Sequence, residues 1–130
     1  MIFISKNEDG IPAWKLILEG KKTVTRRIKP IPVGKEFAVQ PGRGKKAVCR
    51  ARVISCMNTK EWLDWMRINT IADTFKATLS EDSVLWSIKS SANKEAKREG
   101  FKSWTGLCDW FRSKKIDMYK TYRIEFKVIE

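Results

Sequence analysis

Apolar and polar side chains alternate along two segments of the chain, which is the pattern of a strand with one buried face. In residues 47–56, small and aliphatic side chains share one face, and two arginines lie on the other. In residues 122–128, aromatic and aliphatic side chains alternate with Arg123, Glu125 and Lys127. We therefore expect two strands packed on a core, with Arg123, Glu125 and Lys127 facing outward.

Three shorter segments also have the composition of strands. Residues 2–5 are mostly apolar, residues 23–28 are rich in β-branched side chains, and residues 36–40 precede a Pro-Gly turn. A short helix is expected between the first two segments, because Pro12 suits a first helical turn and Gly20 suits a helix end.

The long stretch from residue 59 to residue 117 has the spacing of helices. Thr59 is a suitable cap for the first helix, and further helices are expected over residues 92–98 and 104–111. Strands and helices therefore occupy largely separate parts of the chain, which predicts the α+β fold class. The chain has 130 residues, the size of one domain, so we expect a single domain over residues 1–130.

Two features concern the cellular setting. No apolar run approaches the roughly 18 residues of a membrane span, and the first ten residues contain acids where a secretory signal has an apolar run. The three cysteines cannot all pair with one another and are not spaced as a Cys-x-x-Cys clip, which indicates buried free thiols. We expect a cytoplasmic protein with no membrane partner.

The chain contains no histidine. This excludes Ser-His and Cys-His nucleophile pairs, histidine general bases and the histidine motifs of zinc peptidases. Any catalysis must use lysine, hydroxyl, thiol or carboxylate groups. Acidic side chains are sparse near the basic segment and form no ligand cluster, so we expect no metal site and no cofactor.

Positive charge is concentrated in residues 21–52. This quarter of the chain carries eleven lysines and arginines against Glu36 alone, within a net charge of +12. A focused field of one sign is commonly neutralised by a phosphate backbone, so we expect RNA or another single-stranded nucleic acid as the partner. A generally basic, solubilising surface is the alternative. The residues expected to bind nucleic acid are Lys21, Lys22, Arg26, Arg27, Arg43, Lys45, Lys46, Arg50 and Arg52.

The string Gly-Lys-Lys-Thr-Val-Thr-Arg-Arg at residues 20–27 follows the expected helix end directly. Together with Val-Gly at 33–34, Glu-Gly-Phe at 99–101 and the aromatic strand at 122–126, it resembles the ASCH family of PUA-like domains. The resemblance implies a small PUA-like β-barrel with flanking helices, and a cleft for RNA or a nucleotide between the barrel and the helices. It also marks residues 57–90 as a helical insertion, longer than the family's usual connection.

The expected insertion is rich in tryptophan. Trp62, Trp65 and Trp86 carry the kind of side chain that stacks on nucleic-acid bases, although burial in a core is the commoner use of such residues. The segment 57–90 is also a candidate docking surface for a protein partner.

The resemblance also implies enzymatic alternatives that use the same cleft. One branch of the family looks like an amidohydrolase for acetylated cytidine that uses lysine, threonine and glutamate, of which the first two match Lys22 and Thr25. A lysine with a lowered pKa would activate a threonine hydroxyl without histidine. The family's glutamate falls near Thr105 or Gly106, where this chain has no carboxylate.

Two carboxylates elsewhere, Asp109 and Glu99, are candidates for that third role. Other members of the family resemble ribonucleases that act on single strands, for which Lys22, Ser103 and Tyr122 are the catalytic candidates. RNA binding without turnover, amidohydrolysis and RNA cleavage are therefore three alternatives for one basic cleft.

Overall fold

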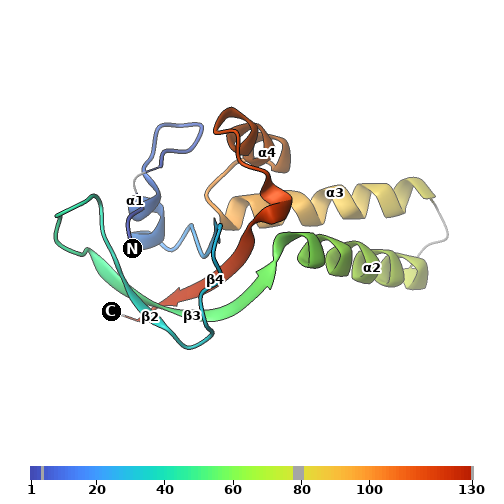
Figure 1. The fold of residues 1–130 in the computed structure, drawn as a ribbon. Helices are drawn as coiled ribbons and strands as arrows, with labels where there is room; N and C mark the ends of the chain where they lie inside the picture. Colours follow the sequence, from blue (N-terminus) through green and yellow to red (C-terminus); the bar gives the residue numbers. More distant parts are fainter. Residues whose placement is uncertain (4, 78–80, 130) are drawn as a thin grey trace.

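Four antiparallel strands form a curled sheet in the order β1-β4-β3-β2 (Figure 1). The strands are β1 (Val24–Arg27), β2 (Glu36–Val39), β3 (Cys49–Asn58) and β4 (Tyr122–Val128). The sheet curves into a half-barrel with helices beside it. This arrangement confirms the α+β class predicted from the sequence.

The structure is a computed structural model that describes residues 1–3, 5–77 and 81–129, apart from the side chains of residues 70–77 and 81–87. The side chain of Trp86, one of the expected stacking residues, is therefore outside the part of the chain that the structure describes. The helices are α1 (Ala13–Leu18), α2 (Thr59–Ala77), α3 (Glu81–Arg98), α4 (Trp104–Ser113) and the 3₁₀ turn η1 (Met118–Lys120). Within the described ranges, no helix is both long and apolar enough to cross a membrane.

The curl of the sheet has a local cause in β3, which is 10 residues long. Its first residues pair with β2, and most of its length pairs with β4. The register with β4 shifts between Val53 and Ser55, so Ile54 lies in a bulge and its side chain is 47% exposed. A bulge bends its strand and increases the local twist, which curves β3 around the core.

The main core lies on one face of the curled sheet. The buried face predicted for residues 47–56 is confirmed from Cys49 to Val53, where buried and exposed residues alternate, whereas Ala47 is exposed. Phe37 and Phe126 pack edge to face with ring centres 5.6 Å apart, a favourable aromatic geometry. α1 covers this face, because Ile17 is fully buried in the same cluster.

The prediction that Arg123 faces outward is wrong. Its side chain is buried against Glu95 of α3 and Trp62 of α2. α2 and α3 pack beside the first residues of β4 (Figure 1), so both faces of the sheet are covered there. Alternation identifies a buried face only where the other face meets solvent. Val128, expected to face inward, is 40% exposed at the far end of the strand.

The strand expected over residues 2–5 is also wrong for the residues described there, since Ile2 makes only an isolated bridge to the residue after β2. The carbonyls of Phe3 and Ser5 accept hydrogen bonds from the first two amides of α1, at 3.0 and 2.9 Å. These backbone groups are therefore used to hold α1 and not to extend the sheet. Ile4 lies outside the described residues.

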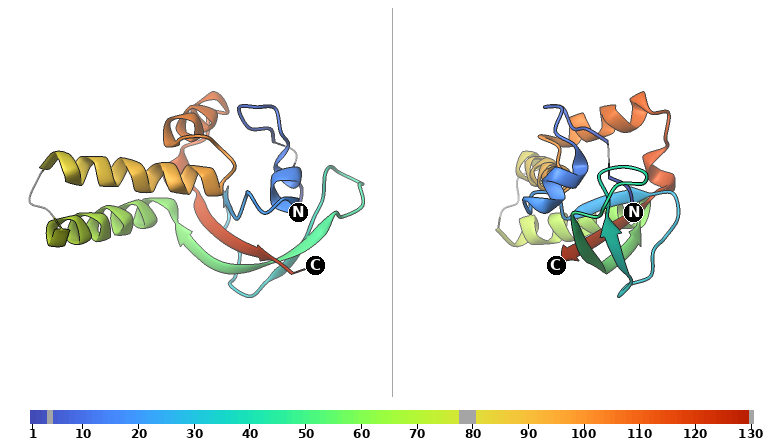
Figure 2. Two further views of the ribbon diagram at one scale, coloured as in Figure 1. Left: turned by 180° about the vertical axis from the view of Figure 1, so that it is seen from behind. Right: turned by 90° about the vertical axis from the view of Figure 1, so that its left-hand side faces the viewer.

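α2 and α3 run side by side and project beyond the sheet (Figure 2). The base of this pair has a small core of its own, in which Trp62 is buried, whereas Trp65 is 56% exposed. The side-chain oxygen of Asn58 accepts a hydrogen bond from the amide of Lys60 at 2.9 Å, so Asn58 caps α2. Thr59, the expected cap, instead pairs its hydroxyl with that of Thr121 at 2.9 Å.

Candidate functional site

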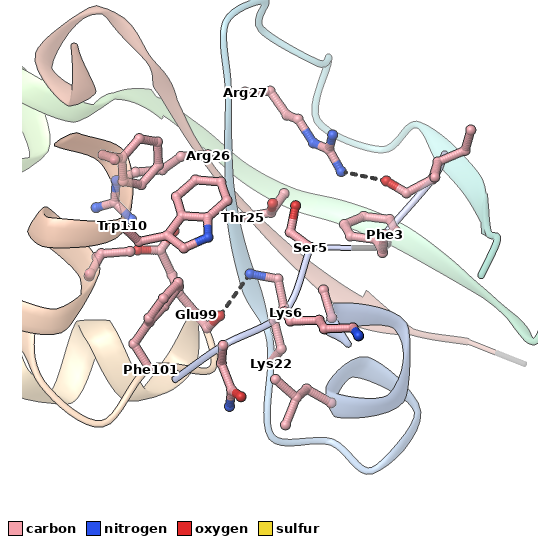
Figure 3. Close-up of a pocket in the computed structure, with 16 residues that line it drawn as sticks. Phe3, Ser5, Lys6, Lys22, Thr25, Arg26, Arg27, Glu99, Phe101 and Trp110 are labelled. Atoms are coloured by element: carbon pink, nitrogen blue, oxygen red, sulfur yellow. Dashed lines mark hydrogen bonds and ion pairs between the residues drawn. The ribbon is translucent and has the colours of Figure 1, made fainter. Parts of the chain in front are cut away.

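A pocket of about 350 Å³ lies between the N-terminal segment, β1 and α4 (Figure 3). Its walls combine polar groups from β1 and the end of α3 with aromatic rings, among them Phe3, Phe101 and Trp110. Ligand pockets of proteins have this size and this mixture of apolar walls and few polar groups. We call it the β1–α4 pocket.

The end of α1 directs Lys22 into this pocket. Gly20 has φ of +76°, a left-handed conformation that favours glycine and closes the helix. The amides of Lys21 and Lys22 then donate to the carbonyl of Leu16 at 2.9 and 3.1 Å. The two neighbouring lysines differ in burial after this turn: Lys21 is exposed, whereas Lys22 is only 7% exposed.

The ammonium group of Lys22 has one hydrogen-bond acceptor in the described part of the chain. Its Nζ donates to the backbone carbonyl of Glu99 at 2.8 Å (Figure 3). Burial lowers the pKa of Lys22 from 10.5 to about 8, and the positive charges of Arg27 and Arg26 act in the same direction against the carboxylate of Glu99. This brings the pKa of Lys22 closer to neutral pH, where the neutral amine is the form that can accept a proton.

Two hydroxyl groups lie beside Lys22. Thr25 of β1 is 6% exposed, and Thr25 and Ser5 both line the β1–α4 pocket. Figure 3 labels both residues among those that line the pocket with Lys22. The structure therefore places the Lys22 amine and two hydroxyl groups along one pocket.

Glu99 supplies the carboxylate of this pocket. Its Oε2 lies 2.5 Å from Nη1 of Arg26, and both side chains are almost fully buried. Gly100, with φ of +94°, follows directly, and a Cβ placed there would lie 2.7 Å from Leu16. Glycine thus lets the end of α3 approach α1 and bring the Glu99 carbonyl to Lys22.

The other expected positions for a third catalytic group lie elsewhere. Asp109 is exposed and pairs with Arg112 at 2.9 Å. A Cβ at Gly106 would lie 2.3 Å from the carboxylate of Glu8, so a side chain there would require the exposed Glu8 side chain to move. The hydroxyl of Ser103 accepts from the amide of Gly106 at 3.1 Å and caps α4. Of the candidates, Glu99 is the one that lines the β1–α4 pocket.

A buried ion-pair cluster supports the pocket from behind. Glu95 accepts from Nη2 of Arg26 at 3.2 Å and from Nη2 of Arg123 at 3.1 Å, and it also accepts from Nε of Arg123. The guanidinium groups of both arginines lie over the Trp62 ring, at 5.5 and 5.3 Å. Arg26, expected to bind nucleic acid, is therefore engaged with Glu95 and Glu99 and contributes to the pocket wall.

Several buried polar atoms of the pocket wall have no hydrogen-bond partner among the described residues. They are Nε and Nη1 of Arg26, Nε of Arg27 and Oε2 of Glu99. The 2.5 Å contact between Arg26 and Glu99 is an ion pair without hydrogen-bond alignment. Unsatisfied buried groups are rare in folded proteins, and these three residues all line one pocket. Nη1 of Arg26 and Oε2 of Glu99 contact each other, so the atoms of the wall with neither a hydrogen bond nor an ion pair to the described part of the chain are Nε of Arg26 and Nε of Arg27.

The remaining basic residues expected in the cleft lie on other surfaces. Arg50 and Arg52 are exposed on the face of β3 opposite the core. The turn between β2 and β3 carries Arg43, Lys45 and Lys46, which are also exposed. The expected single basic cleft is therefore two features, the β1–α4 pocket and an outer basic surface formed by Arg43, Lys45, Lys46, Arg50 and Arg52.

Sequence reasoning missed several residues of the site. Ser5 lies in a segment expected to be a strand, Trp110 lies in a segment expected to be a helix, and no role is expected for Glu95. The signal that was available is the pair of acids on the last turns of α3, Glu95 and Glu99, which lie on one helix face four residues apart. Two acids on one helix face can pair with two arginines of the neighbouring strands, which is what Glu95 and Glu99 do with Arg26 and Arg123.

Among the residues that the structure describes, no group of three Cys, Asp or Glu side chains is placed to hold a metal ion. Polar side chains that line the β1–α4 pocket include Lys22, Thr25, Ser5 and Glu99. Comparison of the chain with protein-family models, with curated proteins and with solved structures gives no match.

Proposed function

We propose that this chain is a hydrolase of the PUA-like, ASCH type that removes an acyl group from the exocyclic amine of a nucleobase such as acetylated cytosine. The observation that carries the proposal is the buried Lys22, which shares the β1–α4 pocket with the Thr25 hydroxyl and the Glu99 carboxylate. In a protein without histidine, a lysine with a lowered pKa is a group that can activate a hydroxyl.

The reaction can be written with these groups alone. Neutral Lys22 takes the proton of Thr25 as the Thr25 oxygen forms a bond with the acyl carbonyl carbon. The C–N bond of the amide breaks, and the Lys22 ammonium returns its proton to the leaving amine. Water then attacks the acyl-threonine ester with Lys22 again as the base, which releases the acid and restores Thr25.

The other groups of the pocket hold the reactants. The Glu99 carbonyl fixes the Lys22 ammonium at 2.8 Å, and the Glu99 carboxylate keeps Arg26 in the wall. The rings of Trp110 and Phe101 provide flat apolar surfaces for a base. A pocket of about 350 Å³ is at the small end of ligand sites, which favours one nucleoside over a longer strand inside it.

Turnover of acetylated cytidine to cytidine tests the proposal. We expect Thr25→Val, which has the same shape, to lower kcat by about 100-fold or more, and Thr25→Ser to keep measurable activity because it keeps the hydroxyl. Product formation followed by liquid chromatography, with circular dichroism of each variant, provides the measurement. Equal activity in the valine variant and the wild type would exclude Thr25 as the nucleophile, and no turnover by the wild type of any acylated nucleoside would refute the hydrolase.

A second candidate function is RNA binding over the outer basic surface, favoured by the exposure of its five cations. For single strands, each phosphate contact contributes about 0.7 to the slope of log affinity against log salt. We expect Lys45→Gln combined with Arg50→Gln to reduce this slope by about 1.4, as measured by fluorescence anisotropy with a mixed RNA oligomer. Glu36→Gln, a neighbouring exposed change, should not reduce it. RNA binding that is absent at low salt would contradict this candidate.

A further inference from the structure

The guanidinium group of Arg27 is a cation without a carboxylate partner among the described residues. Its Nη2 donates to the carbonyl of Ile2 at 3.2 Å, and its Cζ lies 4.7 Å from the centre of the Phe3 ring. Its Nε is buried without a hydrogen-bond partner. Its neighbour Arg26, in contrast, reaches both Glu95 and Glu99.

The β1–α4 pocket therefore has an excess of positive charge. Lys22, Arg26 and Arg27 line it against Glu99, and the Glu99 carboxylate already pairs with Arg26. Burial lowers the pKa of Arg27, which reflects the cost of holding this charge away from water. A buried charge is stabilised by an anion placed against it, and the planar guanidinium group carries several N–H donors in a geometry suited to phosphate oxygens.

Arg27 also lies at a junction in the surface. It lines the β1–α4 pocket and an adjoining groove of about 550 Å³ that continues past Ile28, Lys29 and Trp110. A ligand that fills the β1–α4 pocket would thus reach Arg27 at the edge of the pocket. The part of the ligand bound by Arg27 would face the groove. The exposed Lys29 adds a second positive charge on that side.

We propose that Arg27 binds a phosphate group attached to the nucleoside in the β1–α4 pocket, so that the ligand is a nucleotide and not a free nucleoside. This inference rests on the proposed function for the identity of the base-sized part. The phosphate is either the monoester of a mononucleotide or a diester within an RNA strand whose neighbouring nucleotide lies in the groove. Both present the same oxygens to the guanidinium.

Binding of unreactive ligands tests this proposal without turnover. Dissociation constants are measured by isothermal titration calorimetry for cytidine, cytidine 5′- and 3′-monophosphate and a cytidine dinucleotide, with the wild type and Arg27→Gln. We expect the wild type to bind at least one phosphate-bearing ligand about 10- to 100-fold more tightly than cytidine. Arg27→Gln should lose most of this preference and keep the affinity for cytidine within about threefold. The control is Arg112→Gln, an exposed cation of α4.

Each outcome decides something. Equal affinity of the wild type for cytidine and all phosphate-bearing ligands would overturn the proposal, and so would a preference that survives in Arg27→Gln. If Arg27→Gln fails to fold, Arg27→Lys replaces it, since lysine keeps the charge but not the fork; the preference should then fall severalfold, and an unchanged preference refutes the proposal. A dinucleotide that binds more tightly than both monophosphates assigns the phosphate to a strand. If the protein turned over no acylated nucleoside, the hydrolase proposal would fail, but a measured preference for phosphate-bearing ligands over cytidine would still stand.

Discussion

Glu95→Gln is expected to lower the free energy of unfolding by about 3–5 kcal/mol, the range found when one partner of a buried ion pair is removed. Arg26 and Arg123 are direct register partners on β1 and β4, so two like charges lie side by side on neighbouring strands. Glu95 accepts hydrogen bonds from both guanidinium groups and is 4% exposed. Without its negative charge the two arginines repel each other in a region from which water is largely excluded.

Urea unfolding followed by tryptophan fluorescence measures this effect. Glu36→Gln is the matched control, because Glu36 pairs with Arg52 at 2.9 Å on the exposed surface, where such pairs contribute about 0–1 kcal/mol. Glu95→Gln and Glu36→Gln should therefore differ by several kcal/mol. A change of less than about 1 kcal/mol in Glu95→Gln would mean that the cluster is not a determinant of stability.

The strands that sequence alternation predicts correctly have one face toward the core and the other toward solvent. β3 shows this for Arg50 and Arg52, which are exposed opposite a buried face. Arg123 and Arg26 have similar sequence surroundings, yet both are buried because α3 brings Glu95 against them. Local sequence does not encode this difference, since it depends on a helix that is distant in the chain.

The candidate site, like the strands, is predictable from the sequence only where its residues are close together in the chain. The motif at residues 20–27 directs attention to Lys22 and Thr25, and the structure brings both into one pocket. For the third group the sequence offers both Asp109 and Glu99, and it does not reveal that Glu99 reaches Lys22 through its carbonyl and Arg26 through its carboxylate. Ser5 and Trp110 were missed for the same reason, because an irregular segment and a helix face meet only in the folded chain.

The largest effect on activity is expected from Lys22→Met. Methionine fills similar volume but cannot accept a proton, so turnover of the acylated nucleoside should fall by about 100- to 10,000-fold. The wild-type rate should rise with pH through about 8, the lowered pKa of Lys22, because the neutral amine is the reactive form. Lys21→Met is the matched control, since Lys21 is exposed and pairs with Glu19 at 3.2 Å. A flat pH profile, or equal loss in both variants, would remove Lys22 from the mechanism.

Lys22→Met is expected to lower activity but to raise the free energy of unfolding at neutral pH. The pKa of Lys22 is about 8 in the folded chain and near 10.5 unfolded, so between these pH values the unfolded chain binds more protons. Unfolding free energy therefore rises with pH across this window, by up to about 3 kcal/mol for this one group. Below pH 8 the full cost of burying the ammonium is present, and Lys22→Met is free of it. Urea titrations at pH 7 and pH 10 should show a smaller gain with pH in Lys22→Met than in the wild type or Lys21→Met. An inactive variant that is more stable than the wild type at pH 7 would show that Lys22 is buried at a cost to the fold and serves the reaction.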